Sequence, residues 1–135
     1  MANTGDNKKY ESTEDIIEAL SKIGSAITSD LYLEDILKLI VTVTAEAMHS
    51  KICSIMLLDP KKDVLVMKAT QSISRDYIDK NPLKIGEGVA GKVVELNKPI
   101  AVYSIMDDDD YKNKEVAKKE NLQSMLCVPL RVRGK

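Results

Sequence analysis

The sequence contains no tryptophan and no phenylalanine, and its five tyrosines make up only 4% of the chain. Proteins that bind single-stranded nucleic acid stack bases on aromatic side chains, and proteins that bind duplexes present a basic surface. Neither feature is supplied here, because 20 basic and 21 acidic residues leave a net charge of -1. We therefore expect no nucleic-acid partner.

Long apolar runs and metal-binding side chains are equally scarce. No run approaches the ~20 residues that cross a bilayer, and the polar N-terminus lacks the apolar core of a signal peptide. Cys53 and Cys127 lie in apolar segments, as buried free thiols of a reducing compartment do. One histidine and two distant cysteines cannot complete a zinc site. We expect a cytoplasmic protein with no membrane insertion, no metal and no cofactor.

A chain of 135 residues is one domain by length, and 44% hydrophobic with 30% charged residues is an ordinary globular balance. Residues 1–11 are polar and aperiodic, which predicts a disordered lead. The folded domain is expected over residues 12–135.

Two helices are predicted first. Ser12 or Thr13 begins the first one, whose apolar residues recur at spacings of four, three and four. These residues are Ile16, Leu20, Ile23 and Ile27. So narrow a stripe is typical of a helix–helix seam, which predicts a homodimer formed through the N-terminal helices. After a break at Ser29–Asp30, a second and better buried helix is expected from about Leu33.

The remaining chain changes to a strand-like period. Strands are expected at 52–58 and 64–70 around a turn at 59–63, and later at 100–103 and 124–132. Short helices are expected at 89–96 and 112–120, with a helix or loop at 72–82. This order predicts an α+β fold in which helices pack against an antiparallel sheet.

The segment from Gly86 to Gly91 matches the G-x-G-x-x-G pattern of dinucleotide sites and, with Val93, that of protein kinases. A dinucleotide site needs a preceding buried strand and repeated βαβ units, and the remaining chain is too short for them. A kinase needs a lysine on the next strand and further motifs that are missing. We interpret the segment as a turn that lets a short helix pack closely, with Gly86 or Gly88 at positive φ.

An ordered set of motifs resembles GAF domains. Residues 83–93 and 97–100 resemble the central GAF signature, and residues 36–48 resemble the long second helix of the family. The first and penultimate strands are matched by residues 53–59 and by residues 125–130 with Gly134. The resemblance covers about residues 14–135. It implies the α+β architecture of that family, which is profilin-like and related to PAS domains.

The resemblance also implies a ligand pocket on one face of the sheet, beneath the helix that follows the glycines. Its candidate residues are Val89, Ala90, Val93, Ser104, Ile105, Met106, Asp107, Tyr111 and Met125. For the apolar members the alternative is ordinary core packing. For the acidic run from Asp107 to Asp110 it is a solvated loop that caps a helix, and for Tyr111 it is surface packing.

Several departures narrow the function that the resemblance implies. Ser104 stands where many relatives carry an acidic residue, and the element typical of cyclic-nucleotide binding is absent. Neither cysteine lies where bilin-carrying relatives attach a tetrapyrrole. Ala90 stands where methionine-sulfoxide-reducing relatives have their cysteine, so that nucleophile is missing. We expect no catalytic residues and no enzyme.

GAF domains continue into a further strand and a helix after the position of Lys135. We therefore expect a longer protein with an output domain, or a partner chain that fills the gap. The hosts that fit are a phosphotransferase-system enzyme I, an enhancer-binding activator, a histidine kinase and a diguanylate cyclase. The favoured function is a sensor that binds an unknown small molecule and controls an output domain. The alternative is a ligand-free dimerisation or protein-interaction module.

Overall fold

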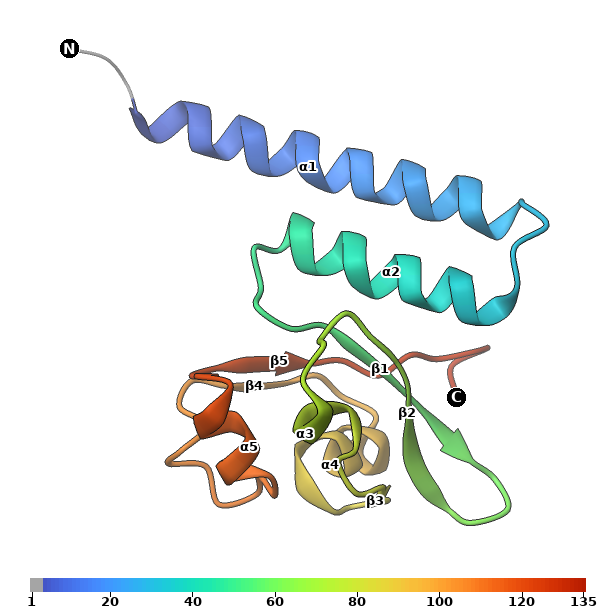
Figure 1. The fold of residues 1–135 in the computed structure, drawn as a ribbon, viewed down its shortest axis with the longest axis vertical. Helices are drawn as coiled ribbons and strands as arrows, with labels where there is room; N and C mark the ends of the chain where they lie inside the picture. The colour runs from blue at the N-terminus through green and yellow to red at the C-terminus, as the bar shows by residue number, and fades with distance from the viewer. Residues whose placement is uncertain (1–3) are drawn as a thin grey trace. The chain divides into compact units, whose positions relative to one another are not determined.

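The computed structural model describes the backbone of residues 4–135 and the side chains of residues 13–135. The chain divides into two compact units (Figure 1). One contains Met1–Ile55 and Met67–Ile73, and the other contains Met56–Val66 and Ser74–Lys135. The hairpin of β1 (Ser54–Asp59) and β2 (Val64–Thr70) is divided between them. Helices combined with small antiparallel sheets confirm the predicted α+β class.

The first unit is built on two helices, α1 (Thr4–Ile27) and α2 (Leu33–Ala47), which run side by side in opposite directions (Figure 1). A turn at residues 28–32 joins them, close to the predicted break at Ser29–Asp30. Among the described side chains of α1, only Ala26 is buried. The small side chain at that position lets the two helices approach closely.

Helix α1 begins earlier than the sequence predicts. Residues 1–3 of the predicted disordered lead lie outside the described residues, whereas residues 4–11 belong to α1. The predicted start at Ser12 or Thr13 is therefore eight residues late or more. Extending an existing helix costs far less than starting one, so polar residues can continue it without an apolar face of their own.

Apolar side chains of α2 and the hairpin form the core of the first unit. Val41, Ile55 and Ala69 are buried together, and Leu37, Ile40 and Cys53 pack against them. The hairpin end is held by polar contacts as well. The Gln71 side chain accepts a hydrogen bond from the Cys53 amide at 2.8 Å, and the Thr70 hydroxyl donates to the Cys53 carbonyl at 3.1 Å.

The turn between β1 and β2 confirms the prediction for residues 59–63. The Asp59 side chain accepts a hydrogen bond from the Lys61 amide at 2.9 Å, and Asp63 adopts a positive φ of 57°. Such side-chain contacts are how aspartate stabilises a turn. In the second unit, β2 continues the sheet to β3 (Leu83–Lys84), with Leu65 opposite Leu83.

The second unit contains the remaining elements. They are α3 (Arg75–Ile78), α4 (Gly88–Leu96), β4 (Ile100–Val102), α5 (Lys114–Lys119) and β5 (Met125–Cys127). Strands β4 and β5 pair in antiparallel register, with Ala101 opposite Leu126. The core of this unit consists of Val89, Val102, Ile105 and Ala117, which are all buried.

Several strand predictions differ from the structure, and β1 and β4 are shifted at their ends by one or two residues. The last strand ends at Cys127 rather than at Val132, and the two-residue β3 was not predicted. β4 has only three residues to pair with β5, and Pro129 has no amide hydrogen with which to continue a ladder. A two-residue strand such as β3 leaves no alternation in the sequence. The strands therefore fall into a three-stranded and a two-stranded sheet.

Candidate functional site

The glycine-rich loop before α4 is a compact turn closed by its own backbone. Gly86 and Gly88 have positive φ values of 83° and 66°, as the sequence predicted. The Gly86 amide donates to the Gly91 carbonyl at 2.9 Å, and the Gly91 amide donates to the Glu87 carbonyl at 3.1 Å. These two amides are therefore occupied within the turn itself.

Gly91 brings α4 directly onto the backbone of β3. A Cβ atom at Gly91 would lie 2.4 Å from the Lys84 carbonyl oxygen, so no other residue fits without movement. The Lys84 carbonyl also accepts a hydrogen bond from the Glu87 amide at 2.9 Å. The glycines therefore allow the short helix to pack closely, as the sequence predicted.

In the acidic loop that follows β4, most carboxylates accept hydrogen bonds from nearby groups. The Ser104 hydroxyl donates to Asp107 at 2.8 Å. Asp108 accepts hydrogen bonds from the amides of Asp110 and Tyr111, at 2.9 and 3.1 Å. These contacts stabilise a turn within the loop. The helix cap of the alternative interpretation is not observed, because Asn113 at the start of α5 makes no side-chain capping hydrogen bond.

Asp110 connects this loop to α4. Its carboxylate lies 2.7 Å from the Lys92 Nζ, and that hydrogen bond is the main reason why the pKa of Lys92 is raised. Burial lowers this pKa by less than the hydrogen bond raises it, and the negative charges of Asp110, Glu95 and Asp108 each add a smaller increase. Both side chains keep substantial contact with water, at 37% and 45% exposed, so solvent screening limits what the pair adds to stability.

Most apolar pocket candidates lie in the core. Val89 and Ile105 are buried members of the core cluster, and Tyr111 and Met125 pack against it. Val93 is also buried, with 1% of its surface exposed. Burial, assisted by the nearby Tyr77, raises the pKa of Tyr111 to about 12, so its phenol stays protonated near neutral pH.

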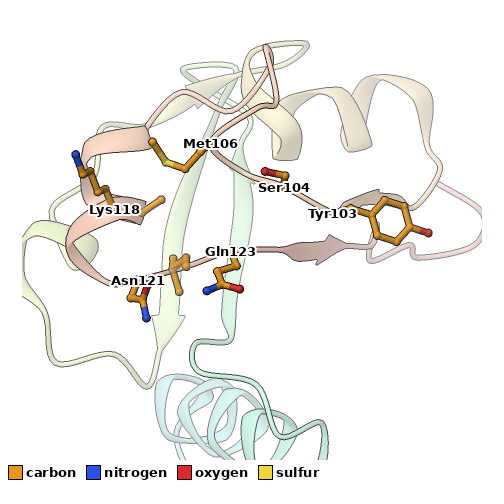
Figure 2. A pocket seen from close by; sticks show the side chains of 8 residues that line it. Tyr103, Ser104, Met106, Lys118, Asn121 and Gln123 are labelled. Carbon is orange, nitrogen blue, oxygen red and sulfur yellow. The ribbon is translucent and has the colours of Figure 1, made fainter.

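A pocket with a volume of about 310 Å³ lies beside this core, between the segment after β4 and the end of α5. Its lining residues are Tyr103, Ser104, Met106, Ala117, Lys118, Asn121, Leu122 and Gln123. Figure 2 shows Met106, Lys118, Asn121 and Gln123 around the depression, whereas Tyr103 projects away from them. Lys118 is the charged member of this lining.

Two backbone hydrogen bonds fix the walls of the pocket. The Ile105 amide donates to the Gln123 carbonyl at 2.8 Å, which ties the two lining segments together. The Leu122 amide donates to the Ala117 carbonyl at 2.8 Å, and Asn121 turns the chain with a φ of 54°. Left-handed residues of this kind commonly end helices, and here the turn places Leu122 and Gln123 at the pocket.

The sequence found part of this lining. It named Ser104 and Met106, which line the pocket, but also Ala90 and Asp107, which do not. It missed the residues from 117 to 123, because it treated the basic helix only as a surface element. The available signal was Asn121 after the helix, a residue type that tolerates the left-handed turn.

The predicted seam on α1 is mostly exposed. Ile16, Leu20 and Ile27 are 41%, 64% and 61% exposed, and Ile23 is half-buried. Ile17, which the sequence analysis did not include, is 61% exposed. The exposed apolar surface of α1 therefore includes Ile17 as well as the predicted residues. Ile23 is only partly exposed within it.

Neither a metal-binding cluster nor a membrane-spanning helix is found in the described part of the chain. Among the described side chains, no group of three or more His, Cys, Asp or Glu is placed to hold a metal ion. Within the same part of the chain, no helix is long and apolar enough to cross a membrane. Both cysteines are free thiols, and burial raises the pKa of each.

The segment that contains the glycine turn, the core and the adjacent pocket matches a known family. Residues 30–135 match the profile of the GAF domain. The chain belongs to the GAF domain family. As a GAF domain it is a regulatory module, as the resemblance implied.

Curated relatives of this GAF domain are much longer proteins. It is 25% identical over 115 residues to a protein of Escherichia coli (strain K12) named "Phosphoenolpyruvate-dependent phosphotransferase system". The protein of that name from Salmonella typhimurium matches equally well. The match covers 85% of this chain but spans only 15% of each relative.

Solved structures show the same fold. The GAF domain of a phosphoenolpyruvate-protein phosphotransferase from Coxiella burnetii is 28% identical, with a TM-score of 0.77 over 90% of this chain and 72% of that one. A free methionine-R-sulfoxide reductase from Neisseria meningitidis is 20% identical, with a TM-score of 0.71 over 93% of this chain and 70% of that one. The second likeness concerns the fold alone.

Proposed function

We propose that this GAF domain is a sensor that binds a small molecule in the pocket between residues 103–106 and 117–123, and that binding controls an output domain. The observation that carries the proposal is the convergence of one cation and several neutral polar groups on that pocket, beside a well-packed core. Such a combination of apolar walls and few polar groups is typical of ligand sites.

The lining favours a small molecule that bears a negative charge. Lys118 supplies the positive charge, and Asn121 and Gln123 supply amides that donate and accept hydrogen bonds. Met106 and Leu122 supply apolar contact. A carboxylate or phosphate beside a short polar group would satisfy this set, because a charge-assisted hydrogen bond is stronger than a neutral one.

Relatives and thiol chemistry support the rest of the proposal. The likeness to GAF domains of phosphotransferases supports an output of that type, and free thiols fit a cytoplasmic location. We also propose that the domain itself is not an enzyme. A catalytic cysteine needs a lowered pKa, whereas burial raises the pKa of Cys53 and Cys127, and Ala90 occupies α4 near the glycine turn.

Binding measurements on the purified chain test the sensor proposal. A panel of small carboxylates, phosphates and amides is screened by thermal shift, and binders are then measured by calorimetry. We expect Lys118→Met to weaken an anionic binder about tenfold, because a hydrogen bond to a charged group is lost. Lys98→Met, an exposed lysine outside the pocket, is the matched control and should leave affinity unchanged. The proposal fails if no compound stabilises the chain or if Lys118→Met binds equally well.

The exposed face of α1 favours a second candidate function, dimerisation through the N-terminal helices. Ile17, Leu20 and Ile27 follow one another at spacings of three and seven, and each is more than half exposed. Gly24 continues the same face, and nothing lies within 4 Å of the position of its absent side chain. A second copy of α1 could therefore pack closely along this face.

Sedimentation of two charge variants tests the seam. Leu20→Glu combined with Ile27→Glu should leave a folded monomer, because both side chains are exposed within the chain. Ala26→Glu is the contrasting variant, since Ala26 is 5% exposed and a charge there should disturb the fold itself. A wild-type chain that sediments as a monomer at high concentration would rule out this function.

A further inference from the structure

The turn between α1 and α2 exposes three large apolar side chains in a row. Leu31, Tyr32 and Leu33 are 48%, 82% and 65% exposed. The turn has its own hydrogen bonds, since the Ser29 hydroxyl accepts from the Leu31 amide at 3.3 Å. Residues 30–35, which are all exposed, are called the tip below.

Helix formation does not explain the apolar residues of the tip. Tyr32 is the N-cap of α2 and makes no side-chain capping hydrogen bond, whereas serine, threonine, aspartate or asparagine can make one. Single exposed apolar residues are common on proteins, but three consecutive ones form a patch that marks a contact surface. The tip is therefore suited to contact with another surface.

The tip also carries negative charge. Asp30, Glu34 and Asp35 are exposed, and none of the four ion pairs among the described side chains includes them. No basic residue occurs in the sequence between Lys22 and Lys38. A surface that fits the tip must therefore combine apolar and basic side chains.

Residues 128–135 of the same chain, called the basic segment below, have this chemistry. Val128, Leu130 and Val132 are 51%, 69% and 77% exposed. No acidic residue occurs after Glu120, and three exposed basic residues occupy alternate positions. They are Arg131, Arg133 and Lys135, which also take no part in the four ion pairs of the described side chains.

The basic segment is held in a defined conformation. Val132 and Lys135 exchange two backbone hydrogen bonds, at 2.7 and 3.1 Å. Arg133 and Gly134 between them have positive φ values of 53° and 78°, as in a tight two-residue turn. The Asn97 side chain also donates to the Gly134 carbonyl at 3.4 Å. An ordered segment loses less conformational freedom on binding than a mobile one does.

We propose that the tip of one copy of this chain binds the basic segment of a second copy. The two surfaces match in charge, and each would cover apolar side chains of the other. Because the contact joins two different surfaces, it is heterologous, unlike the seam that pairs α1 with itself. A contact this small is weak, with an expected dissociation constant of about 0.1 mM. It would add further copies to chains that are already paired through α1.

Fluorescence anisotropy with an amidated peptide of residues 128–135 tests the contact on the full chain. We expect saturable binding, and a peptide with Arg131→Glu and Arg133→Glu should bind about tenfold more weakly, because attraction becomes repulsion. In the chain, Asp30→Lys with Glu34→Lys should weaken the normal peptide similarly. The reversed peptide should then bind the reversed chain as tightly as the normal pair.

Two further chain variants separate this contact from other effects. Glu14→Lys with Glu46→Lys makes the same change in net charge at exposed positions outside the tip, and should leave peptide binding unchanged. Tyr32→Ser should weaken the peptide about tenfold, because an exposed ring is lost from the contact. Serine can cap α2, so the same variant should not be less stable to urea. Unchanged binding by Tyr32→Ser would contradict the proposal.

Sedimentation of mixed variants tests the contact between whole chains. Chains with Asp30→Lys and Glu34→Lys, or with Arg131→Glu and Arg133→Glu, carry like charges on both surfaces and should not associate through them. An equimolar mixture should sediment faster than either variant alone at the same total concentration. The α1 seam contributes equally to all samples, so its failure is distinguishable. No peptide binding up to about 1 mM, equal binding of the reversed peptide, or no faster sedimentation of the mixture would overturn the proposal.

Discussion

Helices α1 and α4 use their apolar residues in opposite ways. In α4, Val89 and Val93 are 4% and 1% exposed, and Gly91 contacts the backbone of β3. In α1, Leu20 and Ile27 are 64% and 61% exposed, and the small Ala26 is buried instead. The apolar residues of α4 complete the fold of their own unit, whereas much of the apolar surface of α1 is exposed.

An apolar stripe on a helix therefore does not by itself indicate what the stripe packs against. A stripe in the sequence marks a surface that avoids water, which can be a core or an interface. The glycines of α4 indicate that this helix packs into a core, because a glycine is required only where another backbone comes close. α1 offers no such mark at its exposed face, because Gly24 lies in open space.

Replacing one glycine in each of the two helices by alanine tests this contrast most strongly. Gly91→Ala should reduce the free energy of unfolding by about 3 kcal/mol, because its Cβ would lie 2.4 Å from the Lys84 carbonyl oxygen. Gly24→Ala should raise it by about 0.5–1 kcal/mol, because alanine favours a helix and meets nothing there. Urea denaturation measures both, and similar effects of the two variants would contradict the contrast.

Lys80 predicts a pH dependence of stability in the second unit. Burial lowers its pKa to about 8 in the fold, against about 10.4 when unfolded, so between these values the unfolded chain binds more protons. The penalty from Lys80 is therefore full below pH 8 and disappears as the pH rises to about 10.4. We expect this to amount to about 1–2 kcal/mol, since the half-buried amine keeps some contact with water.

Other buried groups change the stability with pH in the opposite direction to Lys80, so the effect of Lys80 has to be measured as a difference between two variants. Burial raises the pKa of Tyr111, Cys53 and Cys127. Each of these groups therefore lowers the free energy of unfolding as the pH rises above its pKa in the unfolded chain. The free energy of unfolding is therefore compared between wild type and Lys80→Met from pH 7 to 10.5. The advantage of Lys80→Met should shrink with pH, and a constant difference would refute the assignment.

The acidic loop beside α4 gives the smallest expected effect. Asp108→Ala should lower the free energy of unfolding by about 1 kcal/mol, because two backbone amides lose their acceptor. The adjacent Asp109→Ala is the matched control and should change it little, since Asp109 is exposed. Equal losses from the two variants would show that general charge, not capping, controls this loop.

The sequence predicted most of the fold, for identifiable reasons. The span of β2 and the helix start at Leu33 were predicted as observed, because alternation and a broad apolar face mark them clearly. The predicted end of β5 was wrong, because the length of β5 depends on its pairing with β4, which is distant in the sequence. The predicted start of α1 was wrong because the polar residues before it show no apolar periodicity that would indicate a helix.

The site was less predictable than the fold. Glycine torsions at Gly86 and Gly88 follow from local chemistry and were predicted correctly. The pocket depends on how residues 117–123 return toward residue 105 through a backbone hydrogen bond, and no local pattern records such a contact. Whether the candidate residues bind a ligand stays a prediction.

One measurement tests the sensor proposal most directly. Backbone amide NMR shifts of the isotope-labelled chain are recorded while the tightest-binding small anion of the screen is added. We expect the amides of Ser104, Asn121 and Gln123 to shift in a saturable manner, while those of Leu20 and Ile27 on α1 do not. Shifts confined to α1, or none at residues 103–106 and 117–123, would contradict it.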